Sequence, residues 1–210
     1  MEMLALMTTE TARSIPPKYR LWGTRCYLCG SMDKADDNGE GWRSRLTPFL
    51  ERIGVVVLNP CDKPIDIGIE DEASQQRRRE YIKAGKYPEL ADEMELIRHV
   101  DLRLVDLSDF IIVNLDLDIP ACGTHEEIGW ANRQLNPVLL RVPQGLEHVP
   151  YWLRGMLPSE NIFSTWRDMK EYIRHIHCDE EVDDLGRWVF FDYTKMVPKV
   201  SLAEATLAFV

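Results

Sequence analysis

Residues 110–131 of the chain read FIIVNLDLDIPACGTHEEIGWA, and this stretch decides the fold. It opens with a continuous apolar run, residues 110–115, which is typical of a strand buried on both faces of a sheet. The run ends in acidic residues, turns at Gly123 and continues as the start of a helix. Open α/β sheets bind their ligands at the carboxyl ends of such strands. We therefore predict a functional site directly after this strand.

The rest of the chain repeats this alternation of strands and helices. Strands are predicted at 25–29, 55–58, 110–115, 137–140 and 161–163, and helices at 42–53, 74–84, 89–107, 124–135 and 166–176. Continuous apolar strands between helices predict an α/β fold, with a central parallel sheet of about five strands covered on both faces. We expect an N-terminal tail at 1–20, one α/β domain at 21–178, and a C-terminal extension at 179–210 that packs on the domain or on a neighbouring subunit.

The composition restricts the partners of the protein. The 210 residues carry a net charge of −10, and the dense basic run at 77–79 is followed at once by Glu80. This balance does not favour a nucleic-acid polymer as a partner, so we expect small molecules. The short apolar N-terminus has no basic leader, and no apolar stretch of spanning length follows it. We therefore expect no membrane partner and a cytoplasmic location.

Two sequence patterns raise the question of a metal site. Cys26 and Cys29 form a C-x-x-C, but residues three apart on a strand point to opposite faces. His175, His177 and Cys178 lie at the end of a predicted helix, where histidine also complements the helix dipole. The odd count of five cysteines fits reduced thiols. We predict neither a metal nor a cofactor.

Asp101 lies where an apolar residue is expected. The helix predicted at 89–107 has an apolar stripe made of Leu90, Met94, Ile97 and Leu104. Asp101 falls on this stripe. A buried carboxylate is costly unless it is paired or protonated. Either Arg98 or Arg103 pairs with Asp101, or Asp101 has a function.

Glu127 has two interpretations. Thr124-x-x-Glu127 is a capping box, in which the glutamate binds back to the start of the helix; Gly123 then supplies only the turn, and Glu126 and Glu127 complement the helix dipole. Alternatively, Glu127 and Asp101 meet at the carboxyl end of the sheet. Glycosyl chemistry needs such a pair, about 5 Å apart in retaining enzymes: one carboxylate at the anomeric carbon and one acid for the leaving group.

Three segments of the chain resemble the nucleoside 2-deoxyribosyltransferase superfamily, which includes the 2'-deoxynucleoside 5'-phosphate N-hydrolases. They are Tyr27-Leu28-Cys29-Gly30-Ser31, His99-Val100-Asp101-Leu102 followed by Ser108-Asp109, and Gly123-Thr124-x-x-Glu127-x-Gly129-x-Ala131, the most specific of the three. Together they span roughly residues 25–176. The resemblance implies a flavodoxin-like (Rossmann-like) three-layer sandwich.

The resemblance also implies an activity. Glu127 would be the nucleophile that forms a 2-deoxyribosyl-enzyme intermediate, and Asp101 the acid that protonates the departing base. Transfer of the sugar to a second base makes a nucleoside 2-deoxyribosyltransferase, and transfer to water makes an N-glycoside hydrolase of a deoxynucleoside or its 5'-phosphate. Many transferases have an acidic residue where this chain has Ala121, so an inactive nucleotide-binding module of the same fold is a third alternative.

The resemblance extends to substrate and partners. The partners implied are a 2'-deoxynucleoside or deoxynucleotide and a free nucleobase. The residues expected to bind substrate are Tyr27, Gly30, Ser31, Asn59, Asp116, Asp118, Gly123 and Trp152. The implied assembly is a homo-oligomer, dimer to hexamer, whose sites are shared through residues 149–156; there Tyr151 and Trp152 either stack on a base or a neighbouring subunit or serve as packing residues.

Two departures from the common pattern resemble bacteriophage-encoded members. They are the long insertion at 62–88 and the N-terminal tail. A viral origin implies deoxynucleotide salvage or base modification in the host cytoplasm. The C-terminal carboxylate of Val210 is a further candidate for holding the sugar.

Overall fold

The computed structural model of the protein describes residues 19–32, 35–178 and 185–196. Most of the expected N-terminal tail, parts of the C-terminal extension and Val210 lie outside these residues. The strands are β1 Arg25–Gly30, β2 Val56–Leu58, β3 Phe110–Asn114, β4 Val138–Arg141 and β5 Ile162–Phe163. The helices of at least six residues are α1 Glu40–Arg52, α2 Glu72–Ala84, α3 Tyr87–Leu107, α4 Cys122–Arg133, α5 Tyr151–Met156 and α6 Trp166–Cys178.

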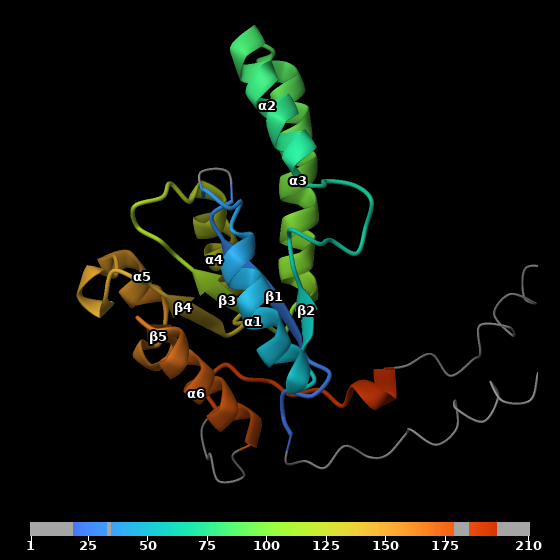
Figure 1. Ribbon diagram of the computed structural model, residues 1–210. Coiled ribbons are helices and arrows are strands. Elements are labelled where there is room, and N and C mark those ends of the chain that lie inside the picture. The colour runs from blue at the N-terminus through green and yellow to red at the C-terminus, as the bar shows by residue number, and fades with distance from the viewer. Residues whose placement is uncertain (1–18, 33–34, 179–184, 197–210) are drawn as a thin grey trace, which may run out of the picture.

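The five strands form one parallel sheet in the order β2-β1-β3-β4-β5 (Figure 1). This is the flavodoxin-like order, and it confirms the predicted α/β fold. The sheet is a layer between two groups of helices, α1 and α6 on one face and α3, α4 and α5 on the other. The strand order changes direction at β1 and β3, so their carboxyl ends flank the crevice where such folds bind ligands.

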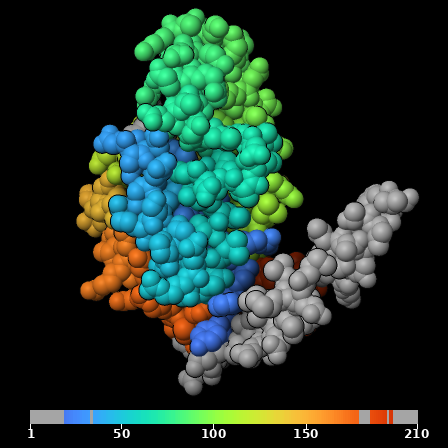
Figure 2. Space-filling view, turned by 45° about the vertical axis from the view of Figure 1, so that its right-hand side comes forward, coloured from blue at the N-terminus to red at the C-terminus, as the bar shows by residue number. Residues whose placement is uncertain are grey.

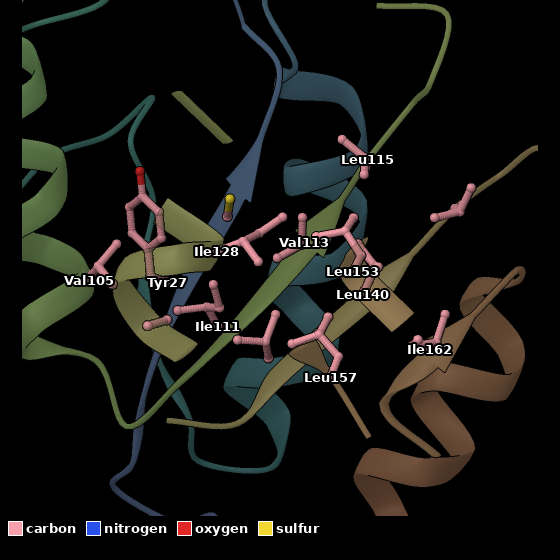
Figure 3. Close-up of a cluster of buried hydrophobic side chains, with 14 of the residues drawn as sticks. Tyr27, Val105, Ile111, Val113, Leu115, Ile128, Leu140, Leu153, Leu157 and Ile162 are labelled. Atoms are coloured by element: carbon pink, nitrogen blue, oxygen red, sulfur yellow. The ribbon is translucent and has the colours of Figure 1, made fainter. Parts of the chain in front are cut away.

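Residues of one strand alternate between the two cores. Cys26 belongs to the cluster beneath α1 and α6, whereas Tyr27 and Cys29 belong to the cluster beneath α3 and α4. Figure 3 shows part of the second cluster, with Tyr27 and Val105 at one end and Ile162 at the other. The expectation that Cys26 and Cys29 point to opposite faces is confirmed, and they do not form a ligand pair.

The insertion at 62–88 supplies most of a helical projection. Helix α2 and the first turns of α3 stand clear of the sheet and its covering helices (Figures 1 and 2). Gly85, with a φ of +68°, ends α2 in the left-handed conformation, and Pro88 lies in the first turn of α3. Glu93 ties the two helices together through an ion pair of 2.9 Å with Arg77. Among the described residues, no helix is long and apolar enough to cross a membrane.

One helix was not expected from the sequence, and the other helices differ from their predicted bounds by up to two residues. Helix α5 forms within 149–156, which the sequence analysis treated as a connecting region; its six residues bury only Leu153 and give too few turns for a periodic pattern. Helix α6 ends at Cys178, two residues beyond its predicted end, and its His177 stacks on Tyr19 with ring centres 5.2 Å apart. Within the described part of the chain, no three metal-binding side chains gather in one place.

The described part of the C-terminal extension packs on the domain through Trp188. Its ring lies 5.1 Å from that of Phe110, and its indole N–H donates to the Tyr172 hydroxyl at 3.2 Å. Because Trp188 is buried, Trp188→Ala is expected to lower the free energy of unfolding by about 3 kcal/mol in urea denaturation. Val189→Ala is the matched control, since Val189 is 61% exposed. Equal unfolding curves for the two variants would contradict this packing role.

Candidate active site

A cavity of about 770 Å³ opens at the carboxyl ends of β1 and β3. Its walls are the turn after β1, one face of α3, the loop before α4 and the first turns of α4. This is the position where an open α/β sheet binds its ligand. The parallel sheet thus brings segments that are far apart in the sequence into one site.

Glu127 is buried at the floor of this cavity, and donors from β1 hold both of its carboxyl oxygens. The Tyr27 hydroxyl donates to Oε1 at 2.7 Å, and the Cys29 thiol donates to Oε2 at 2.9 Å. Tyr27 and Cys29 are two residues apart on a strand, so they present their side chains to the same face. Burial raises the pKa of Glu127 above its ordinary value, and the hydrogen bonds from Cys29 and Tyr27 only partly offset this rise. The carboxylate is therefore fixed in orientation.

The capping-box interpretation of Glu127 is wrong. Helix α4 begins at Cys122, so Thr124 is not its N-cap; the N-cap is Ala121, without a side-chain cap hydrogen bond. The backbone carbonyl of Ala121 already accepts from the N–H of His125 at 3.1 Å, which starts the helix two residues earlier than predicted. Glu126 and Glu127 consequently lie in the second turn, outside the part of the helix where they were expected to complement the dipole.

Asp101 is buried on α3, as its place on the apolar stripe indicated. The alternative in which Arg98 or Arg103 pairs with Asp101 is wrong, because Arg98 binds Glu126 and Arg103 lies 3.7 Å from Asp106. The partner of Asp101 is instead Lys63, whose Nζ lies 2.7 Å from Oδ1.

The surroundings of Asp101 favour its protonated form. Burial, followed by the charge of Glu70, raises the pKa of Asp101 to about 8, although Lys63 acts in the opposite direction. Glu127 contributes to the same rise. Asp101 and Glu127 line the same cavity, so at neutral pH it contains a carboxylic acid beside a second, hydrogen-bonded carboxyl group.

Three other predicted residues also line the cavity, namely Gly30, Ser31 and Gly123. A Cβ on Gly30 would lie 3.0 Å from the Asn114 carbonyl oxygen and 3.1 Å from the Trp42 ring, so a larger residue would crowd this end of the strand. The buried Ser31 Oγ has no hydrogen-bond partner among the described residues. Tyr27 lies beneath the cavity and acts on it through Glu127.

The structure does not bring four of the predicted binding residues to this cavity. Asn59 accepts from the backbone N–H of Cys61 at 3.1 Å in the turn after β2. Asp116 and Asp118 accept from the amide of Gln144 at 2.5 and 3.1 Å. Trp152 is 82% exposed on α5. Their roles in substrate binding stay predictions.

Sequence reasoning missed Lys63 and Glu70. Both come from the charged segment after β2, and no periodic pattern marks either of them as buried. Glu70 lines the cavity, and Lys63 lies behind it, 2.9 Å from Glu70 Oε2. Only the folding of this segment against α3 brings the pair to Asp101.

Comparisons with known proteins give weak likenesses. No protein-family profile and no curated protein matches the chain. Among solved structures, the chain is similar to a 2-deoxyribosyltransferase of Bacillus psychrosaccharolyticus, with 19% identity and a TM-score of 0.45 over 70% of this chain and 91% of the other. It is also similar to a CMP N-glycosidase of Clostridium botulinum, with 18% identity and a TM-score of 0.42 over 72% of this chain and 98% of the other. The fold assignment rests on the observed strand order.

Proposed function

We propose that the protein is a nucleoside 2-deoxyribosyltransferase. It would cleave the N-glycosidic bond of a 2'-deoxynucleoside and transfer the sugar to another base. The observation that carries this proposal is the presence of Glu127 and Asp101 in one cavity, with Glu127 held by two donors and Asp101 favoured as the acid. Environments that separate the roles of two carboxyl groups in this way are what retaining glycosyl chemistry needs.

The proposed reaction has two displacements at C1' of the sugar. A Glu127 oxygen attacks C1' while the C1'–N bond breaks; its electron pair goes to the base nitrogen, which receives the proton of Asp101. This leaves a deoxyribosyl ester on Glu127 and a carboxylate at Asp101. The second base then attacks C1', the ester electron pair returns to Glu127, and the N–H proton of that base goes to Asp101.

The charge of the cavity wall favours a nucleoside over a nucleotide. Five carboxyl groups line it, those of Glu70, Glu95, Asp101, Glu126 and Glu127. Among the described lining residues the basic side chain is Arg98, and it is already paired with Glu126. A 5'-phosphate would meet net repulsion here. The apolar part of the wall, which includes Met94 and Leu102, suits the flat face of a base.

We also propose roles for the remaining contacts. The Ser31 hydroxyl, which has no partner among the described residues, would bind a sugar hydroxyl in the cavity that it lines. Tyr151 and Trp152, which are 91% and 82% exposed, are the residues that a neighbouring subunit of a homo-oligomer would cover. Gel filtration of the wild type and of a Trp152→Ser variant addresses the assembly.

Ala121 favours one alternative reaction. It lines the cavity and gives an incoming base no hydrogen bond, which favours water as the acceptor and hence an N-glycoside hydrolase. Incubation with a deoxynucleoside and a different free base, followed by chromatography, separates the two reactions. We expect a new nucleoside, and slower conversion of the corresponding 5'-monophosphate. Free deoxyribose without exchange would identify the hydrolase, and saturable binding without base release would leave only a binding module.

A further inference from the structure

Lys63 is a buried cation whose contacts are all made within the protein. Its Nζ lies 2.7 Å from the Gly68 carbonyl oxygen, 2.9 Å from Glu70 Oε2 and 2.7 Å from Asp101 Oδ1. The contacts with Gly68 and Glu70 are hydrogen bonds, whereas the contact with Asp101 is an ion pair, and Asp101 Oδ1 accepts no hydrogen bond among the described residues. The Lys63 side chain is only 2% exposed. The lysine is therefore an internal part of the site.

The loop that carries Lys63 and Glu70 is seated tightly on α3. Gly68 has a φ of +63°, and a Cβ at this position would lie 3.2 Å from the Val100 side chain and 3.3 Å from the Ile97 backbone. Glycine thus allows the loop to approach the helix next to Asp101. Lys63 and Glu70 are held in place relative to Asp101 by packing as well as by charge.

The charges of Lys63, Glu70 and Asp101 sum to zero only when one of the two carboxyl groups carries a proton. One ammonium and two ionised carboxylates give a net charge of −1, and a buried unbalanced charge is costly. Glu127 faces Asp101 from α4 and adds repulsion, whereas Tyr27 and Cys29 face it from β1 as neutral donors to Glu127. A proton on one carboxyl group makes the set of Lys63, Glu70 and Asp101 neutral.

Glu70 decides where this proton resides. If Lys63 faced Asp101 alone, the two would form a simple buried ion pair and Asp101 would be ionised. Glu70 shares the ammonium and thereby weakens its pull on Asp101. We propose that Glu70 is a positioning residue that offsets the charge of Lys63, so that Asp101 keeps its proton at neutral pH. The catalytic meaning of this proposal rests on the proposed function, but the proton itself can be observed without turnover.

The proposal predicts opposite effects for two substitutions. In Glu70→Gln the charge of Lys63 falls on Asp101 alone, which lowers the pKa of Asp101. In Lys63→Met the attraction between the ammonium group and Asp101 is lost, which raises the pKa of Asp101. General damage to the site would not produce shifts of opposite sign. Asp92→Asn is the matched control, because Asp92 is an exposed carboxylate of α3 outside the cavity wall.

The test is a pH titration of the full chain labelled with ¹³C at the aspartate carboxyl groups, followed by NMR. The Asp101 resonance is assigned by its absence in Asp101→Asn. We expect its midpoint to fall by about one pH unit or more in Glu70→Gln, to rise by a similar amount in Lys63→Met, and to stay unchanged in Asp92→Asn. An unchanged midpoint in Glu70→Gln, or shifts of the same sign in both variants, would overturn the proposal. Should Lys63→Met fail to fold, the near-isosteric Glu70→Gln alone decides.

Kinetics then separate this proposal from the proposed function. If the protein releases bases, the alkaline limb of its kcat/KM profile moves with the Asp101 midpoint. For a fall of about one pH unit, Glu70→Gln then loses about twofold near pH 7 and close to tenfold near pH 9, and it recovers at lower pH. If the midpoints move as expected but the wild type releases no base, the proposed function fails and the role of Glu70 stands. If bases are released while the midpoint in Glu70→Gln stays unchanged, only the role of Glu70 fails.

Discussion

Glu127→Gln is expected to lower base release by on the order of 10⁴-fold or more, the scale of loss when a catalytic nucleophile is removed. The amide has nearly the shape of the carboxylate, so it fills the same place beneath the cavity, and its carbonyl can still accept from the Tyr27 hydroxyl. It has no anionic oxygen to attack C1'. The loss should therefore appear in kcat, with the fold and its urea denaturation midpoint retained.

Mass spectrometry provides the direct measurement. Wild-type protein that has been mixed with a deoxynucleoside and quenched in acid should carry a deoxyribosyl adduct on the peptide that contains Glu127, and Glu127→Gln should carry none. Asp92→Asn is the control, because Asp92 is an exposed carboxylate of α3 outside the cavity wall. We expect the adduct and activity of the same order as the wild type in that control. Full activity of Glu127→Gln would make the covalent mechanism untenable.

The elements that carry the site were predictable because local patterns determine them. The apolar run at 110–115 forms a strand in the middle of the sheet, and Asp101 interrupts an apolar stripe that does face the interior. The start of α4 was predicted two residues late, because a Thr-x-x-Glu pattern takes no account of the Ala121 carbonyl, which accepts the first helical hydrogen bond.

The partner of Asp101 was not predictable from local patterns. Arg98 lies three residues before Asp101 on the same helix, so helical spacing favoured it, whereas Arg103 is only close in sequence. Lys63 reaches Asp101 only because its loop turns back onto α3 at Gly68, and such a tertiary contact leaves no periodic signal. The two carboxyl groups could thus be identified from the sequence, whereas the groups that control the proton on Asp101 required the structure.

Asp101→Asn is expected to lower the rate of base release and, at alkaline pH, to raise the stability of the fold. Base release should fall by about 10²- to 10⁴-fold, since an amide cannot transfer a proton to the departing base. The defect should be smaller for a nucleoside whose base leaves as a stable anion, because such a base needs little protonation. For the wild type, kcat/KM should decline as the pH rises through about 8, where Asp101 loses its proton. An equal defect with both kinds of base would argue against an acid role.

The same variant should be the more stable protein at alkaline pH. The pKa of Asp101 is raised from 3.8 to about 8 on folding, so the folded state retains a proton that the unfolded state releases. The stabilisation that this proton gives the folded state is complete at pH values below the pKa of Asp101 in the unfolded chain. It is lost as the pH rises through the pKa of Asp101 in the folded protein. Asparagine has no proton to lose, so the two proteins should denature alike in urea near pH 4 and diverge above it. Near pH 8, Asp101→Asn should be more stable by on the order of a few kcal/mol. Parallel pH dependences would show that the fold does not favour the protonated acid, and the proposed proton donor would then have to be sought elsewhere in the cavity.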